Sequence, residues 1–186
     1  MRVIAGSARR LLLKTLPGND TRPTTDKIKE TLFNMINFEL PGSNFLDLFA
    51  GSGAIGIEAL SRGSKKCVFI DNNAKATAVI RENLLHTGFE SISDVITADV
   101  LSALRRMENS GILFDIVFMD PPYRCGLEDS VLNFLKTSKL IDGNSRIIVE
   151  MSSDTDAGHF SDMGYQTDRI KIYKTNKHVF LRRNSL

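Results

Sequence analysis

The chain has 186 residues, of which 42% are hydrophobic and 25% are charged, and its formal net charge is +2. This length and composition predict a single globular domain with a buried core, and the near-neutral charge by itself gives no argument for a nucleic-acid partner. The first residues are too polar for a signal peptide, and no apolar run approaches the roughly 18 residues of a membrane span. We therefore expect a cytoplasmic protein that makes no use of a membrane.

The first 40 residues predict a small extension of the domain. Residues 2–14 are expected to form a β-hairpin, and a helix should begin after Pro23. Thr25 is a suitable N-cap for this helix, and Asp26 in its first turn is favoured by the helix dipole. We expect residues 41–186 to form the core of the same domain.

The core alternates short apolar runs with segments whose apolar residues repeat at a period near 3.6. The runs expected to be buried strands are 43–49, 66–71, 93–98, 115–119 and 146–150, and the helical segments are 54–62, 73–85, 101–108 and 127–136. This alternation predicts an α/β fold with a mostly parallel sheet and helices on both faces. Residues 164–183 predict two further strands around the turn K-T-N-K, so the sheet should end in an antiparallel hairpin.

A glycine-rich turn follows the first core strand. In F-L-D-L-F-A-G-S-G-A-I-G, Gly51, Ser52 and Gly53 lie between the strand and the next helix, with Gly56 three positions further on. Glycines at such a turn allow the backbone to approach a ligand at the helix N-terminus. The spacing also fits the dinucleotide pattern G-x-G-x-x-G, which is weak evidence by itself.

Acidic residues end three successive strands beside this turn. Asp47 precedes the glycines, Asp71 ends the second strand and Asp99 the third. Asp47 would repel a pyrophosphate but suits a cationic ligand. A carboxylate such as Asp71 can accept hydrogen bonds from paired ribose hydroxyls, and Asp99 could accept one from an adenine amino group. Each acid alone could be an ordinary turn residue, but three at one edge of a sheet predict a nucleoside site.

The fourth strand ends in the sequence D-P-P-Y. Neither Pro121 nor Pro122 can donate a backbone hydrogen bond, so the segment presents acceptors in a stiff geometry. Asp120 contributes a carboxylate, Pro121 a carbonyl and Tyr123 an aromatic face. Together they suit a planar heterocycle that carries an exocyclic amine, whose two hydrogens the acceptors would hold. The alternative is a simple strand-terminating turn.

The motifs D-L-F-A-G-S-G, Asp71 and Asp99 resemble the S-adenosylmethionine site of class I, Rossmann-like methyltransferases, whose sheet also ends in a reversed hairpin. The resemblance implies that Asp47, Gly51, Ser52, Gly53, Asp71 and Asp99 hold this cofactor. Asp-Pro-Pro-aromatic is similar to the signature of enzymes that methylate exocyclic amines, which implies a catalytic role for Asp120, Pro121, Pro122 and Tyr123. This chemistry needs no metal.

The segment R-P-T-T-D-K-I-K-E-T-L-F-N, together with the glycine turn and D-P-P-Y-R-C-G-L, resembles the RsmD family of bacterial 16S ribosomal RNA guanine-N2 methyltransferases. The resemblance covers nearly the whole chain. It implies that Thr24 borders the cofactor, that Arg22 and Tyr123 contact the substrate, and that the partner is 16S ribosomal RNA in a partly assembled small subunit. The amino-terminal hairpin departs from the family pattern, since it lacks a second glycine, so Arg9 and Arg10 stand in as its candidate RNA contacts. We expect a monomer.

Two other functions remain open at this point. A DNA adenine or cytosine amino-methyltransferase would use the same motifs, although the short segment after D-P-P-Y leaves no room for a target-recognition region. A non-catalytic RNA-binding assembly factor would keep the fold, but it would need neither a site for a sulfonium nor acceptors for an amine.

Overall fold

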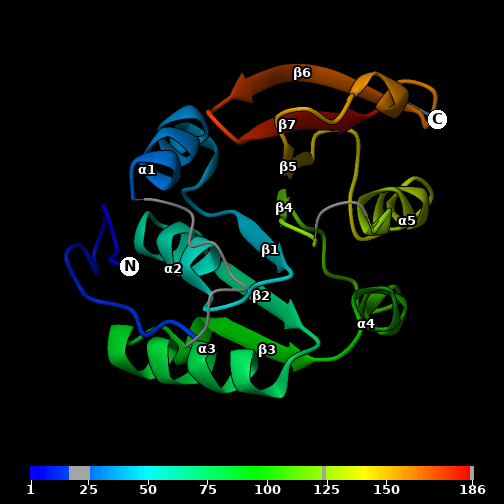
Figure 1. Ribbon diagram of the computed structural model, residues 1–186. Coiled ribbons are helices and arrows are strands. Elements are labelled where there is room, and N and C mark those ends of the chain that lie inside the picture. The colour runs from blue at the N-terminus through cyan, green and yellow to red at the C-terminus, as the bar shows by residue number, and fades with distance from the viewer. Residues whose placement is uncertain (17–25, 123–124, 185–186) are drawn as a thin grey trace.

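The computed structural model describes residues 1–16, 26–122 and 125–184. In these residues one seven-stranded sheet runs in the order β3-β2-β1-β4-β5-β7-β6 (Figure 1). Its strands are β1 (Asn44–Leu48), β2 (Lys66–Asp71), β3 (Ser93–Thr97), β4 (Ile116–Met119), β5 (Arg146–Ser152), β6 (Tyr165–Ile172) and β7 (Asn176–Arg183). The five core strands expected from the sequence are all present, with ends that differ from the expected ones by at most two residues.

The first five strands are parallel to one another, and the last two form the expected antiparallel hairpin. β1 pairs with β2 on one side and with β4 on the other, and β4 pairs with β5. β7 then runs antiparallel to both β5 and β6. The predicted fold class, an α/β Rossmann-like sheet with a reversed carboxyl-terminal hairpin, is confirmed.

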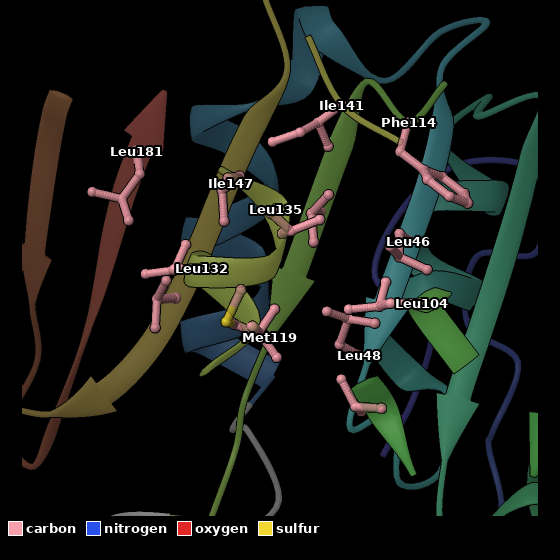
Figure 2. Close-up of a cluster of buried hydrophobic side chains, with 14 of the residues drawn as sticks. Leu46, Leu48, Leu104, Phe114, Met119, Leu132, Leu135, Ile141, Ile147 and Leu181 are labelled. Atoms are coloured by element: carbon pink, nitrogen blue, oxygen red, sulfur yellow. The ribbon is translucent and has the colours of Figure 1, made fainter. Parts of the chain in front are cut away.

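Helices cover both faces of the sheet, as the two-sided burial of β1, β2, β4 and β5 requires. The helices are α1 (Asp26–Met35), α2 (Ala54–Ser61), α3 (Ala74–Thr87), α4 (Val100–Met107) and α5 (Leu127–Leu135). α1, α2 and α3 lie on one face, and α4 and α5 lie on the other (Figure 1). Leu46 and Leu48 of β1 point toward α4 and α5, where Leu104 and Leu132 pack against the sheet (Figure 2). Because successive residues of a strand face opposite sides, Phe45 and Asp47 face the other layer.

The amino-terminal segment, residues 1–16, packs against α2, which is the reason that every residue of this helix is buried. The expected hairpin is present as one antiparallel bridge, between Arg2 and Leu12, and not as two regular strands. A glycine is required where the segment touches α2, because a Cβ atom on Gly6 would lie 1.7 Å from the carbonyl oxygen of Ser61. The Ala8 amide donates to the Ser61 hydroxyl at 3.0 Å, which fixes the same contact.

A buried carboxylate holds this segment and α1 to α2. Glu58 is fully buried and accepts from the backbone amides of Ile4 at 2.8 Å and Ala5 at 3.0 Å. It also pairs with Lys29 at 3.1 Å and with Arg62 at 2.9 Å. Lys29 is fully buried as well, and burial lowers its pKa, against the opposing effect of Glu58. The second half of the R-P-T-T-D-K-I-K motif therefore has a structural role in this chain.

The ends of the helices agree in part with the expected signals. Asp26 lies in the first turn of α1, as expected, whereas the proposed cap Thr25 lies outside the described residues. Asn73 caps α3 by accepting from the Lys75 amide at 2.9 Å. None of the described helices is both long and apolar enough to cross a membrane.

Candidate functional site

The predicted site residues gather at the carboxyl ends of β1, β2 and β4. The chain leaves β1 toward α2 on one face of the sheet, and it leaves β4 toward α5 on the opposite face (Figure 1). The two neighbouring strands therefore form a topological switch point, where open α/β sheets bind their ligands.

The glycine turn connects β1 to α2 through several residues with left-handed backbone. Phe49, Gly51 and Gly53 have φ values of 61°, 57° and 76°. Gly53 is the N-cap of α2 and has no side chain to cap it; among the first amides of this helix, that of Gly56 is bound by Asp47, and those before it face the site. The third glycine of the pattern has another purpose, because a Cβ atom on Gly56 would lie 2.3 Å from the ring of Phe69. Gly56 thus allows α2 to pack closely on β2.

Asp47 lies beneath the glycine turn, with 1% of its surface exposed. Its carboxylate accepts from the Gly56 amide at 2.9 Å. Burial raises the pKa of Asp47 to about 8, the Gly56 hydrogen bond opposes this, and the charge of Asp71 adds to it. A buried acid with a raised pKa lacks a compensating positive charge. The position is therefore suited to a cationic ligand and unsuited to a phosphate.

The acids after β2 and β3 are held in different ways. Asp71 ends β2 as expected, and its two oxygens accept from the amides of Gly51 and Asn73, each at 2.8 Å. It ties the glycine turn to β2, and each oxygen keeps a lone pair for a ligand. Asp99, by contrast, lies beyond the end of β3 and is the N-cap of α4, where it accepts from the Ser102 amide at 3.0 Å. This helix cap accounts for an aspartate at position 99 without any ligand.

Asp120 follows β4 immediately, beside the glycine turn, because β4 pairs with β1 up to the register of Met119 with Leu48. The pKa of its carboxyl is raised well above the ordinary value by burial, then by the negative charges of Glu150 and Asp47. Pro121 is buried and Pro122 is exposed, while Tyr123 lies outside the described residues. The structure thus brings Asp47, the glycine turn and Asp120 together at one edge of the sheet.

Comparison with known proteins identifies the family. A family model described as "Conserved hypothetical protein 95" matches residues 1–179. "Putative rRNA methyltransferase YlbH" of Bacillus subtilis is 39% identical over 150 residues, which are 81% of this chain and 82% of that protein. "Ribosomal RNA small subunit methyltransferase D" of Haemophilus influenzae is 36% identical over 156 residues, 83% of this chain and 80% of that protein. The chain belongs to the RsmD family of methyltransferases.

The fold of this RsmD-family protein agrees with that of solved relatives. The structure of "Putative methyltransferase yhhF" from Escherichia coli superposes with a TM-score of 0.84 at 30% identity and covers 100% of this chain and 99% of that chain. In the described part of the chain, no three His, Cys, Asp or Glu residues are arranged to hold a metal ion.

Not every predicted site residue lies at this edge of the sheet. Arg22, Pro23 and Thr24 lie outside the described residues. Arg9 and Arg10 are exposed and follow Ala8, which is bound to Ser61 at the last residue of α2. An eight-residue helix is about 12 Å long, so these arginines lie roughly one helix length from the glycine turn. Their proposed contacts with RNA stay a prediction.

Several residues that support the site were not singled out by the sequence. Asn83 of α3 donates to the carbonyl oxygens of Lys14 at 3.0 Å and Ser52 at 2.9 Å. It therefore connects the amino-terminal segment to the glycine turn. Glu150 of β5 lies in an apolar strand, and its charge acts on Asp120. The sequence signal that could have identified Glu150 is a single acid inside an apolar run, and the same signal marks Glu58.

Proposed function

We propose that this protein is an S-adenosylmethionine-dependent methyltransferase that transfers a methyl group to the exocyclic N2 amine of a guanine in 16S ribosomal RNA. One observation carries the proposal. Asp120, a desolvated carboxyl group on a proline-stiffened segment, lies at the switch point directly beside the glycine turn and the buried acid Asp47. Acids gather here where a phosphate-binding site would need positive charge, and a sulfonium cofactor meets that requirement.

The residues around the glycine turn would hold the cofactor, which when bound supplies a methyl group on a positively charged sulfur. Asp47 would lie below the ligand and release its proton when the cation binds, which supplies a negative charge there, and the amides at the start of α2 would face the ligand. Asp71 would accept from the ribose hydroxyls with the lone pairs that the backbone amides leave free. The full proposed set is Thr24, Asp47, Gly51, Ser52, Gly53, Asp71 and Asp99.

Asp120 and Pro121 would hold the target amine. The Asp120 carboxylate and the Pro121 carbonyl each accept one N–H of the amine, which directs the nitrogen lone pair toward the methyl group. The carboxylate also stabilises the positive charge that grows on the nitrogen. Pro121 and Pro122 keep the acceptors in place, since both have a fixed φ. Tyr123 would stack on the base, and Arg9, Arg10 and Arg22 would contact RNA.

The ribosomal RNA substrate is supported by the names of the relatives, which include "Ribosomal RNA small subunit methyltransferase D" from Haemophilus influenzae and from Escherichia coli. The guanine N2 position is supported by the resemblance of the R-P-T-T-D-K-I-K-E-T-L-F-N segment to the family. We also propose that residues 1–40 and 41–186 act as one domain, because Glu58 joins the amino-terminal segment and α1 to the core. The protein would act as a monomer in the cytoplasm on a partly assembled small subunit.

Transfer of tritiated methyl groups tests the proposal. The purified protein and labelled S-adenosylmethionine are incubated with small ribosomal subunits, and separately with free 16S RNA, from cells that lack the enzyme. We expect the label in N2-methylguanosine after digestion to nucleosides. Label in adenine, or in DNA supplied instead of RNA, would favour the amino-methyltransferase alternative. Cofactor-independent binding to the subunits without any transfer would favour an assembly factor.

Replacing Asp47 by asparagine is expected to stabilise the cofactor-free protein and to weaken cofactor binding. The folded state keeps the Asp47 proton up to a pKa of about 8, whereas the unfolded state releases it near pH 4, so wild-type stability falls as the pH rises through this window. Asparagine has no such proton and still accepts from the Gly56 amide. Urea unfolding should show an advantage of the variant that grows from pH 4 to pH 8.

Calorimetry on the same variant should show S-adenosylmethionine binding about 10-fold weaker or more, because asparagine cannot ionise beside the sulfonium. Asp94→Asn is the matched control. Asp94 pairs with Lys66 on the exposed side of β3, so this change should leave both measurements as they are. Equal stability of Asp47→Asn and wild type at every pH would show that Asp47 is not held with a raised pKa.

A further inference from the structure

The carboxyl-terminal hairpin closes on a single buried acid of β5. Glu150, with 5% of its surface exposed, accepts from the Asn176 side-chain amide at 2.6 Å. Its other oxygen lies 2.9 Å from Nε2 of His178, which is fully buried. The second ring nitrogen of His178 lies 3.2 Å from the hydroxyl of Tyr173, in the turn between β6 and β7. Asn176 and His178 of the hairpin thus hold the carboxylate directly, and Tyr173 holds the His178 ring.

Both oxygens of Glu150 are engaged by groups of this cluster, one by the Asn176 amide and one by the His178 ring. The carboxylate can only accept, so Nε2 of His178 carries the hydrogen, and Nδ1 shares a hydrogen bond with the Tyr173 hydroxyl. Burial, followed by the charge of Glu150, raises the pKa of Tyr173 to about 12, so this hydroxyl keeps its proton. The hairpin therefore presents donors to both oxygens of Glu150.

That charge lies beside Asp120. β4 and β5 are parallel, with Met119 opposite Val149, so the next residue on each strand is Asp120 and Glu150. Asp120 comes two residues after Phe118 and therefore lies on the same face of the sheet. Phe118 in turn contacts the ring of His178, the partner of Glu150, edge-on at 6.0 Å between ring centres. Glu150 and Asp47 are the charged groups that act on Asp120 from the neighbouring strands, and both are acids.

We propose that Glu150 is a positioning residue for the transfer reaction, whose fixed charge raises the negative potential at the Asp120 carboxyl and strengthens its hydrogen bond to the target amine. Asn176 and His178 act through Glu150 by holding its carboxylate in place, and Tyr173 acts by holding the His178 ring. The inference rests on the proposed role of Asp120. It also gives the reversed hairpin of this sheet a function, since β7 carries two of the three groups that hold Glu150.

Carbon-13 NMR of the aspartate carboxyl groups tests the inference in the cofactor-free protein. The Asp120 signal is assigned by its loss in Asp120→Asn, and its titration is followed in wild type and in Glu150→Gln. Because a neighbouring negative charge favours the protonated acid, its removal should lower the titration midpoint of Asp120 by about one pH unit. An unchanged midpoint would overturn the proposal.

The Glu150→Gln variant keeps the shape of the side chain, and it has a way to satisfy the new amide. Asn176 Oδ1 is buried without a hydrogen-bond partner and can accept from it after rotation of the Asn176 amide. Glu108→Gln is the matched control. Glu108 also accepts two hydrogen bonds, from Ser138 and Lys139, but its charge does not act on Asp120. This control should leave the Asp120 midpoint in place.

The pH dependence of methyl transfer to small ribosomal subunits gives a second measurement. Activity needs Asp120 ionised, so its loss on the acid side should move to lower pH in Glu150→Gln and stay unmoved in Glu108→Gln. If Glu150 had only a structural role, its replacement would lower the rate without shifting the pH at which activity is lost on the acid side. Full activity of Asp120→Ala would refute the proposed function but not the NMR shift. Inactive Asp120→Ala with no shift in Glu150→Gln would refute the positioning role alone.

Discussion

Asp120→Ala is expected to lower the rate of methyl transfer by at least about 100-fold, the typical effect of removing one group that stabilises charge in a transition state. The variant loses both the acceptor of an amine hydrogen and the negative charge beside the developing positive nitrogen. Single-turnover transfer of a labelled methyl group to small ribosomal subunits measures the loss without interference from product release. Binding of S-adenosylmethionine, followed by calorimetry, should be largely retained, because the cofactor residues lie on the other strands.

The stability of Asp120→Ala separates a functional acid from a structural one. Burial and two neighbouring acids raise the pKa of Asp120, so its ionised form costs the folded protein free energy at neutral pH. The alanine variant should consequently be at least as stable as wild type in urea. Asp115→Ala, at the opposite end of the same strand, is the control and should keep its activity even though Asp115 accepts from the Asn44 amide. Joint loss of cofactor binding and transfer in Asp120→Ala would contradict the proposed role.

Residues whose role follows from local pattern were predictable from the sequence. The strands are apolar runs between helical segments, so the parallel pairing of β1 to β5 follows from this alternation. The neighbourhood of Asp47, Asp71 and Asp120 followed in turn, because parallel strands end at the same edge. Gly53 was read correctly as a turn residue at the start of α2, and its φ of 76° agrees.

Roles that depend on long-range packing could not be read in this way. Gly56 lies in the same motif as Gly53, yet its absent side chain makes room for Phe69 of the next strand. Asp99 was expected at a strand end and is a helix cap, since β3 ends at Thr97 and α4 begins at Val100, each one residue earlier than expected. The partners of Glu150 are Asn176 and His178, which lie more than 20 positions away in the sequence. Both belong to β7, and the sequence does not reveal the register of this strand against β5.

The amino-terminal segment shows the same limit and leads to the second large effect. Its arginines suggested RNA contacts, but the residue that determines its position is Glu58, which lies more than 50 positions away. Four donors, namely the amides of Ile4 and Ala5 and the side chains of Lys29 and Arg62, converge on one buried carboxylate. A helix that is buried on all sides tolerates this acid because these donors are in place.

Glu58→Gln is expected to lower the free energy of unfolding by about 3–5 kcal/mol, the cost of breaking a buried ion pair and leaving one partner charged. Glutamine keeps the length of the side chain but loses the charge that compensates Lys29, which is fully buried and would still donate to the Arg2 carbonyl oxygen. Urea unfolding at neutral pH measures the change, with Glu30→Gln as control. Glu30 lies on the exposed side of α1, and its replacement should stay within about 0.5 kcal/mol of wild type.

Adding Lys29→Met to Glu58→Gln should recover part of the lost stability, because the double variant no longer buries an unpaired ammonium group. The order of stability expected is therefore wild type, then the double variant, then Glu58→Gln. A double variant as unstable as the sum of the two single changes would show that the ions act independently. Since Asn83 connects Lys14 of this segment to Ser52 of the glycine turn, Glu58→Gln should also weaken S-adenosylmethionine binding, whereas Glu30→Gln should not.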